Sequence, residues 1–476
     1  MVTFFVSLAI LVVGYFVYGT FVEKVFGADP NRPTPAITME DGVDYVPMHP
    51  ARIFLIQFLN IAGLGPIFGA IAGALWGPVA FLWIVFGTLL AGAVHDYFSG
   101  MLSVRHNGAS ISEVIGIYLG PTMKQIMRGF SVVLLLLVGV IFVLGPAKLL
   151  ATISPLSVSF WVVAIFIYYF AATMLPIDQL IGRIYPVFGA ALLFMAIGIV
   201  GALVIGGYPM PELTLANLHP KNLPIWPLMF ITIACGAISG FHATQSPMMA
   251  RCITNEKQGR GAFYGAMVAE GIVALIWAAA GMTFYNGTAG LAGALGNGGP
   301  GAVVHTVCTS LLGGVGGVLA MVGVIACPIT SGDTAFRSAR LTIADFLDKS
   351  QASIPSRLAI AVPCFVIGAV LCNVDFGIIW RYFAWTNQTL AMFVLWAAAV
   401  YMVEKGKLHW IASLPATFMT AVSVTYILQA PEGLKLATSI SYPAGIAAAL
   451  AAFAFFMVRS KRVEESEEEE EVEEAA

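Results

Sequence analysis

The sequence predicts an all-α polytopic membrane protein of about 13 transmembrane helices, with a core of five plus five helices in an inverted repeat and two discontinuous helices. Three observations predict this fold. Of the 476 residues, 59% are hydrophobic and 10% are charged, whereas soluble domains carry about 25% charged residues. The apolar runs are continuous, which excludes the alternating pattern of an outer-membrane barrel. Two of the runs are interrupted by glycine, proline and polar residues.

The apolar runs place the spans in order along the chain. The first, residues 1–22, has no basic start and no small-residue cleavage site, so we expect a retained helix. The predicted spans are 2–22, 52–74, 78–102, 127–150, 156–174, 184–206, 224–245, 261–286, 302–327, 355–372, 377–402, 408–429 and 438–458.

Charge predicts the orientation. If the carboxyl terminus is cytoplasmic, nineteen of the 23 Lys and Arg residues fall in cytoplasmic segments. An excess of Lys and Arg in cytoplasmic segments is typical of membrane proteins. It predicts that the N-terminus lies outside and the C-terminus in the cytoplasm. The tail 459–476 holds nine glutamates, so the rest of the chain is net positive. An acidic run of this kind predicts a disordered, solvated end.

One interrupted run is Leu228–Arg251, where the apolar sequence contains two glycines, several polar side chains and a proline. Pro247 cannot donate to the carbonyl of Ala243. In hydrocarbon, unwound backbone persists only where it lines a protein cavity, so one interpretation is a discontinuous helix that builds a binding site. The alternative is a helix kinked for packing, with its hydroxyls bonded to its own carbonyls.

A matching interruption, GLGPIFG at 63–69, lies in span 52–74. Each interrupted run starts a block of five spans, and the two blocks have opposite topology, which is the sequence pattern of a transporter site between inverted repeats. The arrangement resembles the amino acid–polyamine–organocation superfamily. The predicted units are a first helix and cytoplasmic loop at 1–51, repeat one at 52–206, repeat two at 224–402, two peripheral helices at 408–458 and the tail at 459–476.

Six motifs in this order resemble the carbon starvation protein A family. They are DGVDYVP at 41–47, GLGPIFG at 63–69, GAVHDYFSGMLSVRHNGASISEVIG at 92–116, ITIACGAISGFHATQSP at 231–247, SGDTAFRSARLTIADFL at 331–347 and WTNQTLA at 385–391. The resemblance implies a bacterial inner-membrane importer, of peptides under carbon starvation or, as the alternative, of pyruvate with protons. The chain is shorter than the longer members, and its HATQSP run differs from theirs.

The two interruptions supply the candidate binding residues, because half-helix ends offer N–H groups to a carboxylate and carbonyls to a cation. We expect backbone contacts from Gly63, Leu64, Gly65, Ser239, Gly240 and Phe241, and side-chain contacts from Gln57, Asn60, His242, Thr244 and Gln245. Neutral imidazole can accept a proton near neutral pH, so His242 is a candidate for proton coupling; the alternative role is a hydrogen-bonded pocket or gate histidine.

Buried acids are the other candidates for coupling. Asp96 either couples protons or pairs with His95 or Arg105 as a scaffold, and Glu270 is a further proton candidate. Asp333 either binds a cation with Thr330 and Ser331 or forms an i,i+4 ion pair with Arg337. The superfamily resemblance implies a sodium ion at Asn60, Gly63, Thr330 and Ser331. Asn387, Gln388 and Thr389 either join helices or line the pocket.

The leading function is a secondary active importer driven by a proton or sodium gradient. The sequence has no phosphate-binding loop and no HExxH motif, so ATP drive or an intramembrane enzyme is not indicated; a channel is the other class considered. Its 6 cysteines show no CxxC and no His/Cys cluster, so we expect no zinc site and no disulfide framework. We predict no cofactor beyond the coupling ion, and as partners a small substrate and the bilayer, without nucleic acid.

Overall fold

A computed structural model describes residues 1–42, 44–174, 177–349, 351 and 353–475, with the side chains of these residues except 174–185 and 462–475. Every regular element in this part of the chain is a helix, which confirms the predicted fold class. Ten of its helices are long and apolar enough to cross a membrane, or eleven when one bent pair is counted as a span. The number 13 and the inverted repeat stay predictions.

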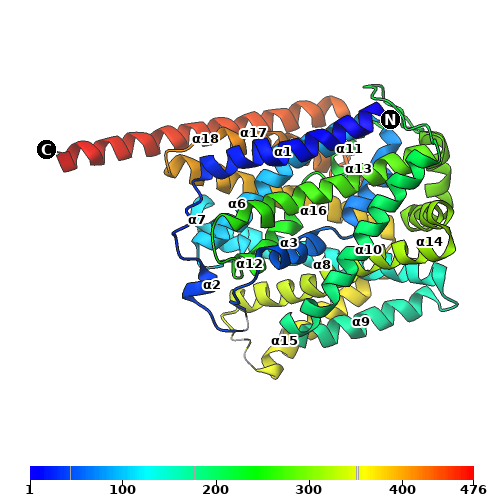
Figure 1. The fold of residues 1–476 in the computed structure, drawn as a ribbon. Helices are drawn as coiled ribbons and strands as arrows, with labels where there is room; N and C mark the ends of the chain where they lie inside the picture. The colour runs from blue at the N-terminus through cyan, green and yellow to red at the C-terminus, as the bar shows by residue number, and fades with distance from the viewer. Residues whose placement is uncertain (43, 175–176, 350, 352, 476) are drawn as a thin grey trace.

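The helices run mostly alongside one another, with the N-terminus at one end of the bundle and the C-terminus at the other (Figure 1). Their bounds are α1 Val2–Phe26, α2 Pro35–Thr38, α3 Pro50–Ile61, η1 Gly65–Gly69, α4 Ala70–Gly73, η2 Ala74–Trp76, α5 Val79–Leu82, η3 Trp83–Gly92, α6 Ala93–Arg105, α7 Ile111–Leu119, α8 Pro121–Ile153, α9 Val158–Met174, α10 Ile177–Ile205, α11 Leu228–Thr232, α12 Gly240–Ala250, η4 Arg260–Gly265, α13 Ala266–Phe284, α14 Thr288–Phe346, α15 Ile354–Leu371, α16 Phe376–Glu404, α17 Trp410–Gln429 and α18 Thr438–Ala475.

Two helices differ in extent from the sequence prediction. Helix α14 begins at Thr288, well before the predicted span 302–327, and non-helical glycines at 299 and 313 interrupt it. Helix α18 continues to Ala475, through the tail that the charge pattern predicts to be disordered. Glutamate and alanine have high intrinsic helix propensity. A prediction of disorder from charge alone does not take this propensity into account.

Both predicted discontinuous helices are present. Helix α3 ends at Ile61, and the helix resumes at Gly65 after a bend of 54°. Helix α11 ends at Thr232 and α12 begins at Gly240, with residues 233–239 unwound between them. Pro247 is not part of this break, because α12 continues through it to Ala250. The second break therefore lies nearer the start of the interrupted run than the proline indicated.

The two breaks pack directly against each other. A Cβ atom on Gly65 would lie 2.1 Å from the Cβ of Cys235, so only glycine permits this approach. Gly236 has φ +89°, a conformation that other residues rarely adopt, and a Cβ added to it would lie 3.3 Å from the Cα of Pro66. Helix α12 also contacts α3, α6 and α16. The unwound segments thus meet in the buried centre of the bundle.

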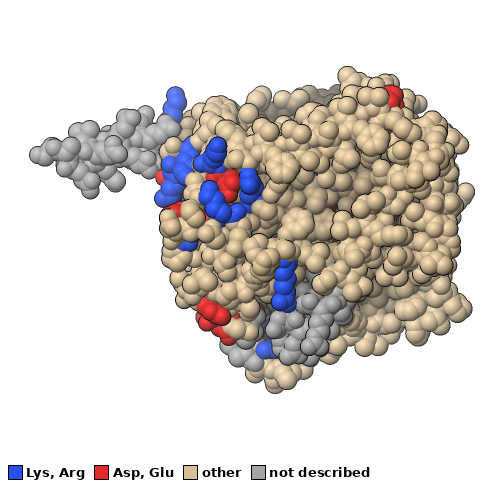
Figure 2. Space-filling view, in the orientation of Figure 1, with Lys and Arg blue, Asp and Glu red and all other residues tan. Residues whose placement is uncertain are grey.

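Charged side chains concentrate at one end of the molecule. Figure 2 shows Lys and Arg gathered near the end from which α18 extends, while the opposite end of this face carries almost no charge. Several of these basic groups pair with buried acids: Arg105 with Glu256 at 3.0 Å, and Arg260 with Glu23 at 3.5 Å. One end of the bundle is therefore basic, as a cytoplasmic face is in most multi-pass proteins.

Candidate functional site

Two neighbouring amides on α16 hold the two ends of the second break. The Asn387 Oδ1 accepts from the backbone N–H of Phe241 at 2.8 Å and from the Ser239 hydroxyl at 3.1 Å. Gln388 Nε2 donates to the carbonyl of Phe230, in α11. One amide thus caps the start of α12 and the next binds the end of α11. Of the two interpretations of these amides, joining helices is the one that these contacts bear out.

The unwound backbone between those ends also has partners. Trp83 Nε1 donates to the carbonyl of Ile233 at 3.1 Å, and the Thr88 hydroxyl donates to the carbonyl of Gly236 at 2.9 Å. Both side chains come from η3, in the third apolar segment. Two carbonyls of the unwound segment, those of Ile233 and Gly236, therefore accept hydrogen bonds in this conformation. Trp83 and Thr88 were missed, because nothing in an apolar run marks which residues face a distant break.

A chain of ionisable side chains runs through the same region. His95 Nδ1 lies 2.7 Å from Asp96 Oδ1, and Asp96 Oδ2 lies 2.9 Å from His242 Nδ1. The other ring nitrogen of His242, Nε2, lies 3.3 Å from Glu270 Oε2. All four side chains are fully buried. They come from α6, α12 and α13, so three helices meet at one imidazole.

This chain brings together three predicted coupling residues. Asp96 pairs with His95, as the scaffold interpretation expected, but Arg105 pairs with Glu256 instead. Asp96 also contacts His242. The same side chain therefore makes the contact that the scaffold interpretation requires and one that suits proton coupling. An imidazole between two carboxylates can take up one proton or pass it to a neighbouring carboxylate, so that the proton stays within the cluster. Ionisable groups buried at membrane depth are functional candidates for this reason.

The remaining predicted binding residues are less closely grouped. Thr244 donates to the carbonyl of Phe241 at 2.6 Å and accepts from Gln245 Nε2 at 3.0 Å, so both bond within α12. Thr244 also borders a cavity of about 60 Å³ beside Arg251 and Asp345. Gln57 is fully buried, and neither of its side-chain polar atoms has a hydrogen-bond partner among the described residues.

Ser331 meets the first broken helix, as the predicted sodium site requires. Its hydroxyl lies within hydrogen-bond distance of two carbonyls, that of Leu59 at 3.1 Å, next to the buried Asn60, and that of Cys327 in its own helix at 2.9 Å. Thr330 instead bonds back to the carbonyl of Cys327 at 2.7 Å. The two hydroxyl oxygens keep lone pairs for a cation, but their protons are committed to carbonyls. The sodium site, with Gly63 as its fourth member, stays a prediction.

Asp333 lies apart from the Asp96 chain. Its Oδ1 is 3.9 Å from Arg337 Nη2, and that guanidinium donates to the carbonyl of Ala172 at 2.6 Å. The geometry therefore fits the i,i+4 ion pair, which helps to join α14 to α9.

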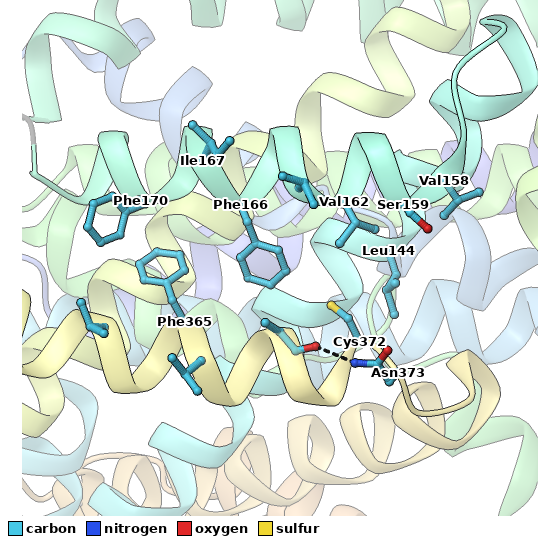
Figure 3. A pocket seen from close by; sticks show the side chains of 14 residues that line it. Leu144, Val158, Ser159, Val162, Phe166, Ile167, Phe170, Phe365, Cys372 and Asn373 are labelled. Atoms are coloured by element: carbon cyan, nitrogen blue, oxygen red, sulfur yellow. Dashed lines mark hydrogen bonds between the residues drawn. The ribbon is translucent and has the colours of Figure 1, made fainter.

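A larger groove, of about 700 Å³, lies between α9 and α15 (Figure 3). Its walls are almost entirely apolar, with Phe166 of α9 and Phe365 of α15 at 6.2 Å between ring centroids. Several side chains along it are exposed, among them Ile167 and Val366. An exposed, mostly apolar groove on membrane helices fits lipid chains, and its lining has no charged side chain to orient a carboxylate. We therefore place the candidate site at the breaks.

Comparison of the sequence with models of known protein families identifies the family of this chain. A model for the carbon starvation protein CstA matches residues 1–160 and 144–290, more than half of the chain. The chain belongs to the carbon starvation protein CstA family. The family resemblance drawn from the motifs is thereby confirmed.

Three relatives illustrate the range of the family. A membrane protein of Haemophilus influenzae is 47% identical over 339 residues, covering 60% of this chain and 91% of its own. The peptide transporter CstA of Bacillus subtilis is 29% identical and covers 88% of both chains. The pyruvate/proton symporter BtsT of Escherichia coli is 30% identical, over 57% of this chain and 47% of its own. Both named relatives are transporters and not enzymes.

Solved structures show the same fold at low identity. MhsT in complex with L-phenylalanine matches with a TM-score of 0.55 at 14% identity, over 86% of this chain and 98% of its own. Mhp1, a nucleobase-cation-symport-1 family transporter, matches with a TM-score of 0.50 at 14% identity, over 87% and 92%. This likeness establishes the fold of a multi-pass transporter.

Proposed function

We propose that this chain is a secondary active importer of peptides that works by alternating access and is driven by a proton gradient. The observation that carries the proposal is the position of His242, on a broken helix and between the carboxylates of Asp96 and Glu270. A protonation change there alters the forces between α6, α12 and α13. Helix α12 begins where the second break ends, so a proton can bias the conformation of the backbone around the substrate.

The start of α12 is the proposed anchor for a substrate carboxylate. Helix N-termini favour anions through free N–H groups and the helix dipole. In this conformation the Asn387 amide oxygen takes the Phe241 N–H and the Ser239 hydroxyl. A carboxylate would take over these two donors when the breaks separate. The close packing of Gly65 on Cys235 requires such a separation before a substrate can enter.

Pyruvate is the second candidate substrate, and two observations favour it. A relative that covers 57% of this chain is a pyruvate/proton symporter. The breaks also pack closely, since a Cβ added at Gly236 would lie 3.3 Å from the Cα of Pro66, so a small carboxylate needs less movement than a peptide. A sodium ion at Ser331 and Leu59 is the alternative coupling ion. We assign the chain to a bacterial inner membrane, with its basic end and its C-terminus in the cytoplasm and its N-terminus outside.

The test is uptake into proteoliposomes, with proton and sodium gradients imposed separately and labelled dipeptide or pyruvate supplied outside. We expect the wild type to accumulate dipeptide under a proton gradient. His242→Asn should abolish accumulation while retaining downhill exchange, and His305→Asn, on α14, should behave as the wild type. Accumulation of pyruvate alone would establish the second candidate. Flux without a gradient would indicate a channel, and an altered product an enzyme; either would overturn the proposal.

A further inference from the structure

Three potential metal ligands converge at the second break. A sulfur of Cys235, a ring nitrogen of His242 and a carboxylate oxygen of Glu270 lie within 4.8 Å of one another, and all three residues are buried. They belong to the unwound segment 233–239, to α12 and to α13. The sequence predicts no zinc site, because the cysteines show no regular spacing with histidines. The fold brings the three side chains together from separate elements.

The nitrogen and oxygen ligand atoms lack other partners among the described residues, and the Cys235 thiol makes one hydrogen bond, to the Ser239 hydroxyl at 3.4 Å. His242 Nε2 and both oxygens of Glu270 are buried without a hydrogen-bond partner among the described residues. His242 Nε2 and Glu270 Oε2 lie 3.3 Å apart. Metal–ligand bonds of about 2.0–2.2 Å in a tetrahedral zinc site separate nitrogen and oxygen ligands by roughly 3.3–3.5 Å. The observed spacing already fits a shared metal ion.

Asp96 supports this geometry from behind the imidazole. Its Oδ2 lies 2.9 Å from His242 Nδ1, and its Oδ1 lies 2.7 Å from His95. Metal-bound histidines almost always donate their other N–H to a carboxylate or carbonyl, which fixes the tautomer and the orientation of the ring. The chain His95–Asp96–His242 provides that outer support and leaves Nε2 free to bind a metal.

We propose that Cys235, His242 and Glu270 form a binding site for a soft divalent cation such as Zn²⁺, and that its occupancy inhibits transport. Thiolate and imidazole select zinc over magnesium or calcium, which prefer oxygen ligands. Binding releases the Cys235 thiol proton to the buffer. Inhibition, though not binding, rests on the proposed function.

The reason for inhibition is the place of Cys235 at the junction of the two breaks. Its side chain packs on Gly65 of the first break, while Glu270 belongs to α13. A metal bound to both would tie the unwound segment to α13. The breaks could then not separate, and separation is the movement that substrate entry requires.

Binding is tested first, on the full chain in detergent, with Co²⁺ alone as the probe. We expect a thiolate-to-cobalt charge-transfer band in the wild type, displaced by Zn²⁺. The band should be lost in Cys235→Ser and kept in Cys308→Ser, a buried cysteine on α14. Asp96→Asn should weaken binding by about 10–100-fold, the usual cost of an outer-support partner. A band that survives in Cys235→Ser, or no band in the wild type, would overturn the site.

Inhibition is tested separately in proteoliposomes. Zn²⁺ should reduce uptake by the wild type and by Cys308→Ser over the concentration range in which it binds, and should leave Cys235→Ser unaffected. Thermal melting with and without Zn²⁺ reports the fold of each variant, and only variants with the site should gain stability. Binding without inhibition would overturn the regulatory half alone. Failure of all uptake would count against the proposed function, while the cobalt spectrum would still decide the metal site.

Discussion

The two broken helices differ in what stabilises their unwound backbone. The first has three residues between Ile61 and Gly65, and the Leu59 carbonyl just before it accepts from one hydroxyl, that of Ser331. The second spans residues 233–239 and is bound by side chains from η3 and α16. Among the described residues, the chain of buried ionisable groups Asp96, His242 and Glu270 lies at the second break.

This difference assigns different roles to the two breaks. Unwound backbone in a membrane must find protein partners, and partners on other helices couple the break to the positions of those helices. The second break therefore responds to η3, α6, α13 and α16 together. The first break packs on it through Gly65 and has fewer partners of its own. We infer that the second break senses the ion and that the first follows it.

The largest expected effect is at Asp96, which holds the imidazole beside the second break. Asp96→Ala leaves His95 and His242 without their shared acceptor. We expect a loss of about 3–5 kcal/mol, the usual cost of breaking a buried ion pair by removing one partner. The measurement is thermal melting in detergent. Ser99→Ala is the matched control, because Ser99 bonds to the Asp96 carbonyl and to Ser246 and carries no charge; equal losses in both variants would contradict the charged role.

The next effect is at Asn387, which caps the start of α12. Asn387→Ala removes the acceptor of the Phe241 N–H and of the Ser239 hydroxyl. Leaving buried donors unpaired costs about 1–3 kcal/mol, and the start of α12 should fray. Hydrogen exchange of α12 measures this directly. Thr386→Ala, whose hydroxyl bonds only to carbonyls of its own helix, should leave that exchange unchanged.

The sequence was sufficient to predict the fold class, the presence of a break in each interrupted run and the candidate acids Asp96 and Glu270, while the second break lies earlier in its run than predicted. Glycine, proline and polar residues within an apolar run are local signals, and they mark a break wherever the helix forms. Asp96 and Glu270 were found because acids are rare in such runs. Of the residues that the sequence selected on chemistry, the structure groups Asp96 and Glu270 around His242, while Gln57, Thr244 and Gln245 lie outside that group.

The partners of those residues could not be predicted. Thr88 and Trp83 lie in an unremarkable apolar run, and only the packing of η3 on the second break gives them a role. Cys235 had no recognisable spacing from Glu270, because they lie on different elements that meet in space. For Asp333 the sequence left two interpretations open, a cation site with the hydroxyls and an ion pair with Arg337, and the geometry fits the ion pair. Proximity across the bundle is set by helix packing, which local patterns do not encode.

A smaller effect is expected at the first break. Ser331→Ala removes one hydrogen bond to the Leu59 carbonyl, worth about 0.5–1.5 kcal/mol. The loss should be below that of Asn387→Ala in the same melting assay, and a larger loss would reverse the comparison between the breaks. The variant also tests the predicted sodium site. If sodium binds there, Na⁺ will raise the melting temperature of the wild type relative to K⁺, and Ser331→Ala will lose that difference.

The smallest effect is expected outside both breaks, at Glu113 of α7, which pairs with Lys124 and Arg128 of α8. Burial raises the pKa of Glu113, but the two cations outweigh it and hold the pKa below its ordinary value of 4.5. The charged pair therefore stabilises the fold above that value, and the contribution is lost as the pH falls through the lowered pKa. Because the group is partly solvated, Glu113→Gln should cost at most about 1 kcal/mol at neutral pH. Melting temperatures of the two proteins should converge in acid; if they stay apart there, Glu113 acts through packing and gives no baseline for the charge effects at the second break.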